Sequence, residues 1–143
     1  MTTFKHILVP TDFQGASSSA LNVAVNLAKK HDARVTLLHV WEIPVYPYLD
    51  FMLASDVVSS VEDAATKGLS RAVTELRKEF PGAESQLRTG EAWQQIQDAI
   101  RELGADLVVM GTHARRGLSH LMLGSVAEKT VRLSPVPVLT VHE

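Results

Sequence analysis

The feature that most constrains the fold is an alternation of five short apolar segments with intervening stretches, in three of which apolar residues recur every three or four positions. Apolar segments of about four to eight residues, rich in β-branched side chains and bounded by Gly or Pro, are typical of strands buried on both faces. The recurrence at three or four positions is typical of helices that pack by one side. We expect strands at residues 4–9, 34–40, 85–89, 106–110 and 136–141.

The expected helices carry their apolar stripes at residues 20–28, 57–69 and 96–103, and a fourth helix is expected from Ser125 to just before Pro135. Strictly alternating strands and helices predict a mostly parallel sheet with right-handed crossovers and helices on both faces. A chain of 143 residues is close to the size of one domain. The sequence therefore predicts a single doubly wound α/β domain over residues 1–143, for which we assume the strand order 3-2-1-4-5.

Composition excludes several classes of function. The chain has no cysteine, which excludes disulfides, thiolate nucleophiles and cysteine-ligated metals. A net charge of -2 provides no broad field for nucleic acid, and we expect no nucleic-acid partner. No apolar run approaches the roughly 18 residues of a membrane span, so no membrane partner is expected. The N-terminal residues lack the pattern of a secretory signal, and a cytoplasmic location is expected.

The candidate site follows from two strand ends. The first strand ends in Pro10-Thr11-Asp12, and the fourth ends in Gly111-Thr112 followed by His113. Ligands of open parallel sheets bind beyond the carboxyl ends of the strands, where the chain reverses its winding direction. With the assumed strand order these two ends are neighbours, which places the Asp12 carboxylate beside a glycine-bearing loop.

That loop runs from Gly111 to Ser125 and has two features of a phosphate site. Gly111 allows a ligand to approach the backbone closely, and Gly124-Ser125 opens a helix whose free N–H groups and dipole favour an anion. A turn at Gly111 and a simple N-cap at Ser125 would explain the same residues, and both interpretations stay open from these residues alone. Ser125 and Glu128 also match the capping-box pattern.

Other sites have weaker support in the sequence. Neither the P-loop pattern nor G-x-G-x-x-G after the first strand is present. No pair of histidines or carboxylates has metal-ligand spacing, so no metal site is predicted, and any magnesium is expected to arrive with nucleotide phosphates. His39 lies inside the second strand and is interpreted as a structural histidine.

Several segments resemble the universal stress proteins in order and register over nearly the whole chain. They are Ile7-Leu8-Val9-Pro10-Thr11-Asp12, Leu37-Leu38-His39-Val40, Val109-Met110-Gly111-Thr112-His113, Leu123-Gly124-Ser125-Val126-Ala127-Glu128 and Pro135-Val136-Pro137-Val138-Leu139. The resemblance implies a five-stranded parallel sheet of order 3-2-1-4-5, as in adenine nucleotide α-hydrolase-like folds. The nucleotide-binding branch carries G-x2-G-x9-G-[ST], and this chain keeps the spacing with Ala114 in place of the middle glycine.

The resemblance also implies a set of nucleotide-binding residues. Asp12 would approach the adenosine, Val40 would contact adenine through its backbone, and Ala114 would lie with Gly124 and Ser125 against the phosphates. The adjacent Arg115 would either add positive charge there or be solvated, and His113 would either hydrogen-bond a phosphate or brace the turn. The complete predicted set is Pro10, Thr11, Asp12, Val40, Met110, Gly111, His113, Ala114, Arg115, Gly124, Ser125 and Val126.

These residues predict an ATP- or AMP-binding regulatory or sensor protein of the stress response. No residue near the phosphate loop is an evident general base, so no catalytic residue is predicted and hydrolysis is expected to be slow. The alternatives are a nucleotide-free dimeric adaptor and a slow ATPase. The last strand, from Val136 to Val141, is an apolar edge that Pro137 protects only in part, and we expect a homodimer through it, as the resemblance also implies.

Overall fold

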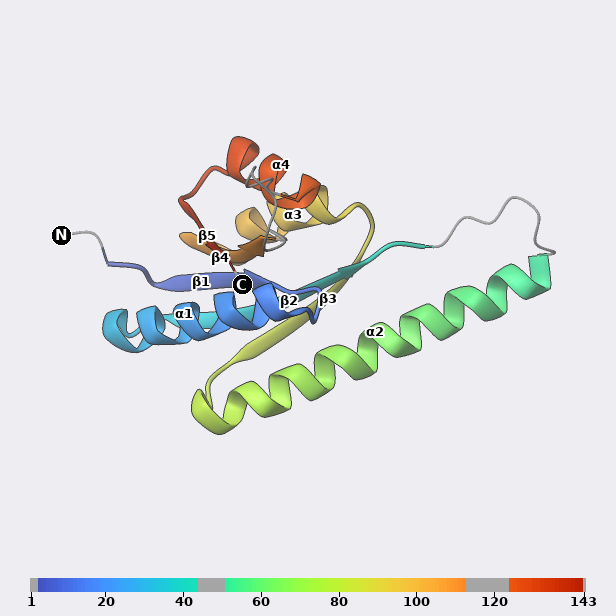
Figure 1. Ribbon diagram of the computed structural model, residues 1–143, viewed down its shortest axis with the longest axis horizontal. Helices are drawn as coiled ribbons and strands as arrows, with labels where there is room; N and C mark the ends of the chain where they lie inside the picture. The colour runs from blue at the N-terminus through green and yellow to red at the C-terminus, as the bar shows by residue number, and fades with distance from the viewer. Residues whose placement is uncertain (1–2, 44–50, 113–123, 143) are drawn as a thin grey trace.

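The computed structural model describes residues 3–43, 51–112 and 124–142 and confirms the predicted class and strand order (Figure 1). Five parallel strands form one sheet in the order β3-β2-β1-β4-β5. The elements in chain order are β1 (His6–Pro10), α1 (Gly15–His31), β2 (Arg34–Trp41), α2 (Phe51–Glu79), β3 (Glu84–Thr89), α3 (Ala92–Leu103), β4 (Leu107–Thr112), α4 (Ser125–Leu133) and β5 (Val138–His142).

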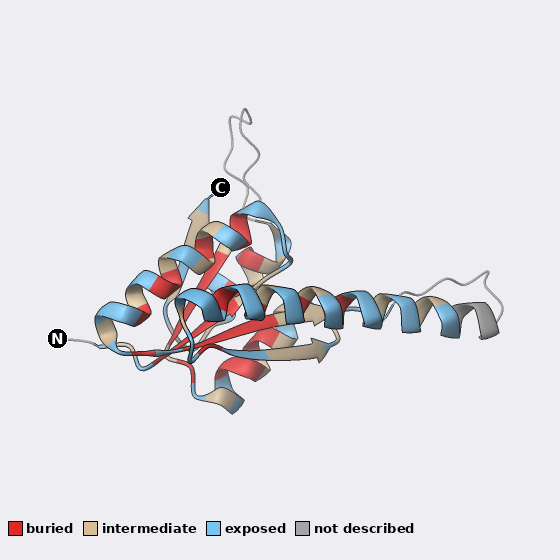
Figure 2. Ribbon diagram, turned by 90° about the horizontal axis from the view of Figure 1, so that it is seen from below, coloured by how far each residue is buried: buried red, intermediate tan, exposed pale blue. Residues whose placement is uncertain are grey.

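Two apolar cores lie on opposite faces of the sheet. On one face α1 and α2 pack over strand residues that include Val9 and Val35. On the other face α3 and α4 pack over the alternate positions, such as Leu8 and Leu38. Figure 2 shows the buried residues concentrated in the central strands and on the helix sides that face them. Because neighbouring strand residues point to opposite faces, both cores are built from the same continuous apolar runs.

The edges of the sheet differ from its centre. Ile7, Leu8 and Val9 of β1 are completely buried, whereas every residue of β5 is half-buried or exposed. Strand β5 begins at Val138 rather than at the expected Val136. A proline has no backbone N–H to donate to a neighbouring strand, and Pro137 contributes only its carbonyl, which accepts from Val108 N at 3.0 Å.

The predicted capping box at the start of α4 is wrong. Gly124 is the N-cap residue, so Ser125 occupies the first helical position and its side chain is not placed to cap the helix. The first intrahelical bond runs from Glu128 N to Gly124 O at 2.9 Å. The S-x-x-E pattern is therefore out of register by one residue. The N-terminal N–H groups of α4 receive no side-chain cap from the N-cap residue.

A buried histidine ties β1 to the rest of the sheet. His6 is 3% exposed, and its Nε2 lies 2.7 Å from Thr36 Oγ1 while its Nδ1 lies 3.2 Å from the Leu103 carbonyl oxygen. Since a carbonyl only accepts, Nδ1 carries the proton, and the Thr36 hydroxyl donates to Nε2. Burial, and secondly the Arg34 guanidinium, lower the pKa of His6 below its ordinary value. The fold therefore favours a neutral imidazole.

Helix α2 reaches beyond the sheet. Its 29 residues extend from the edge near β3 well past the ends of the strands (Figure 1; Figure 2). Among residues 55–79, for which burial is described, the first buried position is Ala65, and Leu69, Val73 and Leu76 complete the contact with the core. Within the described part of the chain, neither α2 nor any other helix has the length and hydropathy to cross a bilayer.

Candidate functional site

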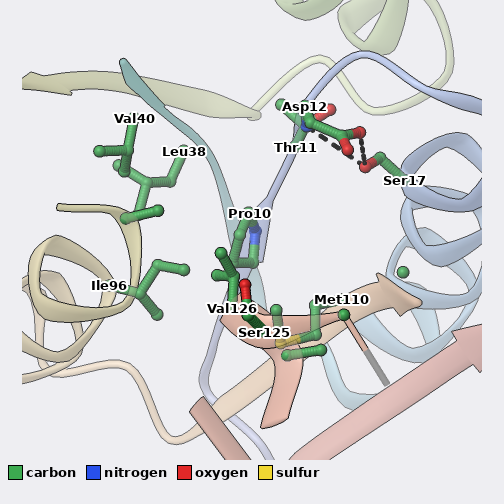
Figure 3. A pocket seen from close by; sticks show the side chains of 14 residues that line it. Pro10, Thr11, Asp12, Ser17, Leu38, Val40, Ile96, Met110, Ser125 and Val126 are labelled. Carbon is green, nitrogen blue, oxygen red and sulfur yellow. Dashed lines mark hydrogen bonds between the residues drawn. The ribbon is translucent and has the colours of Figure 1, made fainter. Parts of the chain in front are cut away.

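A pocket of about 180 Å³ lies at the carboxyl ends of β1, β2 and β4, beside the N-termini of α3 and α4 (Figure 3). This is the point at which the crossovers from β1 and β4 pass to opposite faces of the sheet. The pocket is lined by Pro10, Thr11, Asp12, Ser17, Leu38, Val40, Ala92, Ile96, Met110, Gly111, Gly124, Ser125, Val126 and Ala127.

One part of the pocket is apolar. Leu38 and Val40 come from β2, and Ile96 comes from the face of α3 that packs on the sheet. Figure 3 shows these three side chains grouped on one side of the pocket, away from Asp12. Walls of this kind suit a flat heterocycle, because apolar surface contacts both faces of a ring without requiring hydrogen bonds.

The polar part of the pocket is the turn between β1 and α1. Asp12 Oδ1 accepts hydrogen bonds from Ser17 Oγ at 2.7 Å and from Gln14 N at 2.9 Å. The backbone N–H of Asp12 donates to Ser17 Oγ at 3.3 Å. Asp12 itself is exposed, whereas Ser17 is 7% exposed. The turn thus presents a carboxylate whose orientation is fixed by its own neighbours.

The turn is held on β2 by backbone and ring contacts. Thr11 N donates to Leu38 O at 2.8 Å, and the Thr11 carbonyl accepts from His39 Nδ1 at 2.7 Å. The structural interpretation of His39 is therefore confirmed. Phe13 adopts a left-handed conformation with φ of 65°, and its ring lies 4.2 Å from the His39 ring, centroid to centroid. These contacts fix the backbone on both sides of Asp12.

Gly111 lies on the wall formed by β4. A β-carbon built on this glycine would stand 2.4 Å from Ala16 C and 2.7 Å from Ser17 N. The sequence suggested that this glycine lets a ligand approach the backbone. In the structure, the space that a side chain would occupy at Gly111 is filled by the first turn of α1. Close packing of α1 on β4 therefore explains why this position is glycine.

A third part of the pocket is the N-terminus of α4. Gly124 precedes the helix with φ of -57° and ψ of 156°, and Gly124 through Ala127 all line the pocket. The first N–H groups of a helix have no acceptor within the helix, and the helix dipole adds partial positive charge there. This end of the pocket can hold an anion such as phosphate.

The structure brings together the predicted site residues that it describes. Nine of them line the pocket, namely Pro10, Thr11, Asp12, Val40, Met110, Gly111, Gly124, Ser125 and Val126. His113, Ala114 and Arg115 lie outside the described residues. Within the described ranges, no group of three or more His, Cys, Asp or Glu side chains is arranged to hold a metal ion.

Sequence reasoning did not single out five lining residues. These are Ser17, Leu38, Ala92, Ile96 and Ala127. The sequence places Ile96 only in a core stripe and Ser17 only at the start of a helix. For Ser17 a signal exists in retrospect, because a serine in the first turn of a helix five residues after a strand-ending aspartate is within reach of that carboxylate.

Comparison with known proteins gives a consistent result. The model of the universal stress protein family matches residues 3–142. The universal stress protein YxiE of Bacillus subtilis is 32% identical over 147 residues, which covers 97% of this chain and 99% of that protein. The structure of UspA from Lactobacillus plantarum superposes with a TM-score of 0.84 at 24% identity, covering 99% of both chains.

Two more distant structures of the same fold contain nucleotides. A universal stress protein of Arabidopsis thaliana, 19% identical, has AMP bound and superposes with a TM-score of 0.68, covering 97% of this chain and 92% of the other. A universal stress protein of Archaeoglobus fulgidus, 22% identical, was solved in complex with dAMP and superposes with a TM-score of 0.64, covering 98% and 99% of the two chains.

Proposed function

The chain belongs to the universal stress protein family, and from this premise we propose that it binds AMP or ATP in the pocket at the ends of β1, β2 and β4. The observation that carries the proposal is the division of the pocket into apolar walls, a fixed carboxylate and a helix N-terminus. Base, sugar and phosphate are suited to these three environments. The AMP and dAMP complexes of the two fold neighbours support the choice of an adenine nucleotide.

Each part of the nucleotide has a proposed partner. The adenine lies between the apolar side chains of Val40 and Ile96. The phosphates lie at Gly124 and Ser125, where the N–H groups of α4 donate to them. The Asp12 carboxylate, which would repel a phosphate, accepts instead from an uncharged donor, for which the sugar hydroxyls are suited. Magnesium, where it is bound, accompanies the phosphates of ATP.

We propose that binding occurs with little hydrolysis. Asp12 has the one titratable side chain among the described residues that line the pocket. Its Oδ1 already accepts two hydrogen bonds, so this oxygen is engaged before an attacking water could be held there. The nucleotide therefore acts as a signal whose occupancy is read, and regulation or sensing is the proposed role.

The proposed assembly is a homodimer through β5. Strand β5 is an edge of the sheet, and no strand of the described residues pairs with its outer side. Large apolar side chains of this region are exposed, with Leu139 at 39%, Val131 at 45% and Leu133 at 46%. An apolar edge strand stabilises pairing with a second chain. We propose a cytoplasmic location as well, which suits a chain without cysteine.

The proposed function is tested on the purified protein. Heat denaturation followed by mass spectrometry of the released small molecules is expected to yield an adenine nucleotide, and the stripped protein is expected to bind AMP and ATP saturably. Asp12→Asn is expected to weaken AMP binding by about tenfold, because the amide loses the charged acceptor. If no nucleotide is released and none binds at millimolar concentration, the nucleotide-free adaptor replaces this proposal.

A further inference from the structure

Asp12 and Ser17 form a hydrogen-bonded pair within the pocket (Figure 3). The Ser17 hydroxyl donates to Asp12 Oδ1 at 2.7 Å, and the hydroxyl oxygen accepts from the Asp12 backbone N–H at 3.3 Å. Ser17 belongs to the first turn of α1 and is 7% exposed, whereas Asp12 is exposed. A buried hydroxyl therefore restrains an exposed carboxylate through a hydrogen bond.

We propose that Ser17 is a positioning residue that sets the sugar specificity of the site. It holds the Asp12 carboxylate in the orientation that accepts a ribose hydroxyl, and it thereby determines the preference for ribonucleotides over deoxyribonucleotides. This inference rests on the proposed nucleotide function and goes beyond it by naming the residue that discriminates between sugars.

The first support is the number of donors on one carboxylate oxygen. Oδ1 of Asp12 receives hydrogen bonds from both Ser17 Oγ and Gln14 N. Two donors restrain this oxygen before any ligand arrives, and a group restrained in advance loses less conformational entropy on binding. Removal of the Ser17 hydroxyl takes away the shorter of these two hydrogen bonds.

The second support is the fixed position of Ser17 itself. Its backbone nitrogen stands 2.7 Å from the place where a β-carbon on Gly111 would lie. Helix α1 is therefore seated tightly on β4 at this turn, and the backbone of Ser17 cannot shift along the sheet without losing that packing. The packing of α1 on β4 therefore determines where the Asp12 carboxylate lies relative to the wall of the pocket that β4 forms.

The third support is the distribution of polarity in the pocket. The apolar side chains of Leu38, Val40 and Ile96 lie on one side and the Asp12–Ser17 pair on another (Figure 3). The N-terminus of α4 favours negative charge, and a phosphate bound there would repel a second anion such as the Asp12 carboxylate. The part of a nucleotide that carries uncharged donors away from the base and the phosphate is the sugar.

The test compares the Kd values of AMP, 2′-deoxyAMP and 3′-deoxyAMP by calorimetry for the unsubstituted protein and for Ser17→Ala. The unsubstituted protein is expected to prefer AMP over at least one deoxy form. Ser17→Ala is expected to raise the Kd of AMP by about fivefold, because a restraint on a charged acceptor is lost. The Kd of that deoxy form is expected to stay within about twofold of its value in the unsubstituted protein. The preference for the ribonucleotide should therefore fall toward one.

The matched control is Ser18→Ala. Ser18 occupies the next position in the same helical turn, is exposed, and its hydroxyl donates only a long bond of 3.5 Å to Gln14 O. Its removal changes the same chemical group on the same helix without touching Asp12, and all three Kd values are expected to stay as in the unsubstituted protein.

Three results would overturn the inference, and they are distinguishable. Equal weakening of all three ligands in Ser17→Ala shows a merely structural serine, and unchanged Kd values show no role in binding. If Ser17→Ala does not fold, Asp12→Asn replaces it, and an unaltered ribose preference in that variant overturns the inference. Failure of the unsubstituted protein to bind either AMP or ATP refutes the proposed function itself.

Discussion

Gly111 and Ala16 are packed so closely that no side chain fits between them. A β-carbon on Gly111 would lie 2.4 Å from the carbonyl carbon of Ala16 and 2.5 Å from its oxygen. Real β-carbons do not approach backbone atoms to this distance. The contact seats the first turn of α1 on β4, and the same turn supplies Ser17 to the pocket. One glycine therefore links the packing of the sheet to the geometry of the site.

Replacing this glycine should destabilise the fold. Gly111→Ala is expected to lower the free energy of unfolding by about 3 kcal/mol and Tm by about 8 °C, because the obstructing atoms belong to the backbone and cannot rotate away. Thermal unfolding followed by circular dichroism measures the change. Gly82→Ala is the control, since no atom of the described residues lies within 4 Å of the place where its β-carbon would stand, and its Tm should stay within about 2 °C.

Stability should depend on pH through His6. The folded state lowers the pKa of this imidazole, chiefly by burial. Protons therefore bind more readily to the unfolded chain, and the contribution of neutral His6 is complete above the unfolded pKa of about 6.5 and is lost as pH falls through the folded pKa. Urea unfolding midpoints are expected to fall between about pH 7.5 and about pH 5.

The variant His6→Gln isolates this effect. Glutamine supplies a donor and an acceptor at the same position but does not titrate, so the variant should lose part of the pH dependence in addition to some stability. The quantity to compare is the slope of unfolding free energy against pH. An identical slope in both proteins would show that other groups produce the acid sensitivity.

The proposed dimer can be broken at β5. Leu139→Lys places a charge on the apolar edge strand and should raise the dimer dissociation constant at least tenfold, because edge lysines oppose strand pairing between chains. Sedimentation equilibrium measures the change. Ile43→Lys is the control, since Ile43 is 54% exposed and follows β2, which lies on the far side of β1 from β5. Equal weakening by both variants would place the interface elsewhere.

Turnover of ATP should stay slow. Phosphate release under saturating ATP and magnesium is expected at no more than about one event per minute, far below the ~10 s⁻¹ that is usual for an enzyme. The physical reason is that the pocket offers Asp12 as its titratable side chain among the described residues, already engaged as an acceptor. Rapid release that disappears in Ser125→Ala would establish an ATPase instead.

The sequence predicted the fold well because its signals are local. Continuous apolar runs identify strands buried on both faces, and the structure places Ile7, Val35 and Val108 in such strands. The ends of elements were less predictable. Pro137 delays β5, and the capping box at Ser125 was displaced by one residue because Gly124 takes the N-cap position. Such boundaries depend on single hydrogen bonds that apolar periodicity does not report.

The lining residues of the pocket were predictable at the strand ends and at the start of α4. Asp12, Gly111 and Gly124 follow directly from the switch-point argument and from motif spacing, and the structure places all three in the pocket. Ser17 and Ile96 come from helices and reach the pocket through packing. Their role depends on how α1 and α3 sit on the sheet, which is a tertiary property that no pattern within one helix encodes.

The most direct test of nucleotide binding is a calorimetric titration of stripped protein with AMP and with adenosine, for the unsubstituted chain and for Gly124→Asp. Aspartate is a favourable N-cap residue and the position has φ of -57°, so α4 should persist while the new carboxylate repels phosphate. Gly82→Asp adds the same charge at an exposed turn and serves as the control.

We expect one AMP per chain in the unsubstituted protein and in Gly82→Asp. In Gly124→Asp we expect AMP affinity to fall at least about 30-fold, because a charge-assisted phosphate contact is lost. Adenosine affinity is expected to change by less than about threefold. AMP affinity in Gly124→Asp equal to that of the unsubstituted protein would contradict the assignment of α4 as the phosphate site.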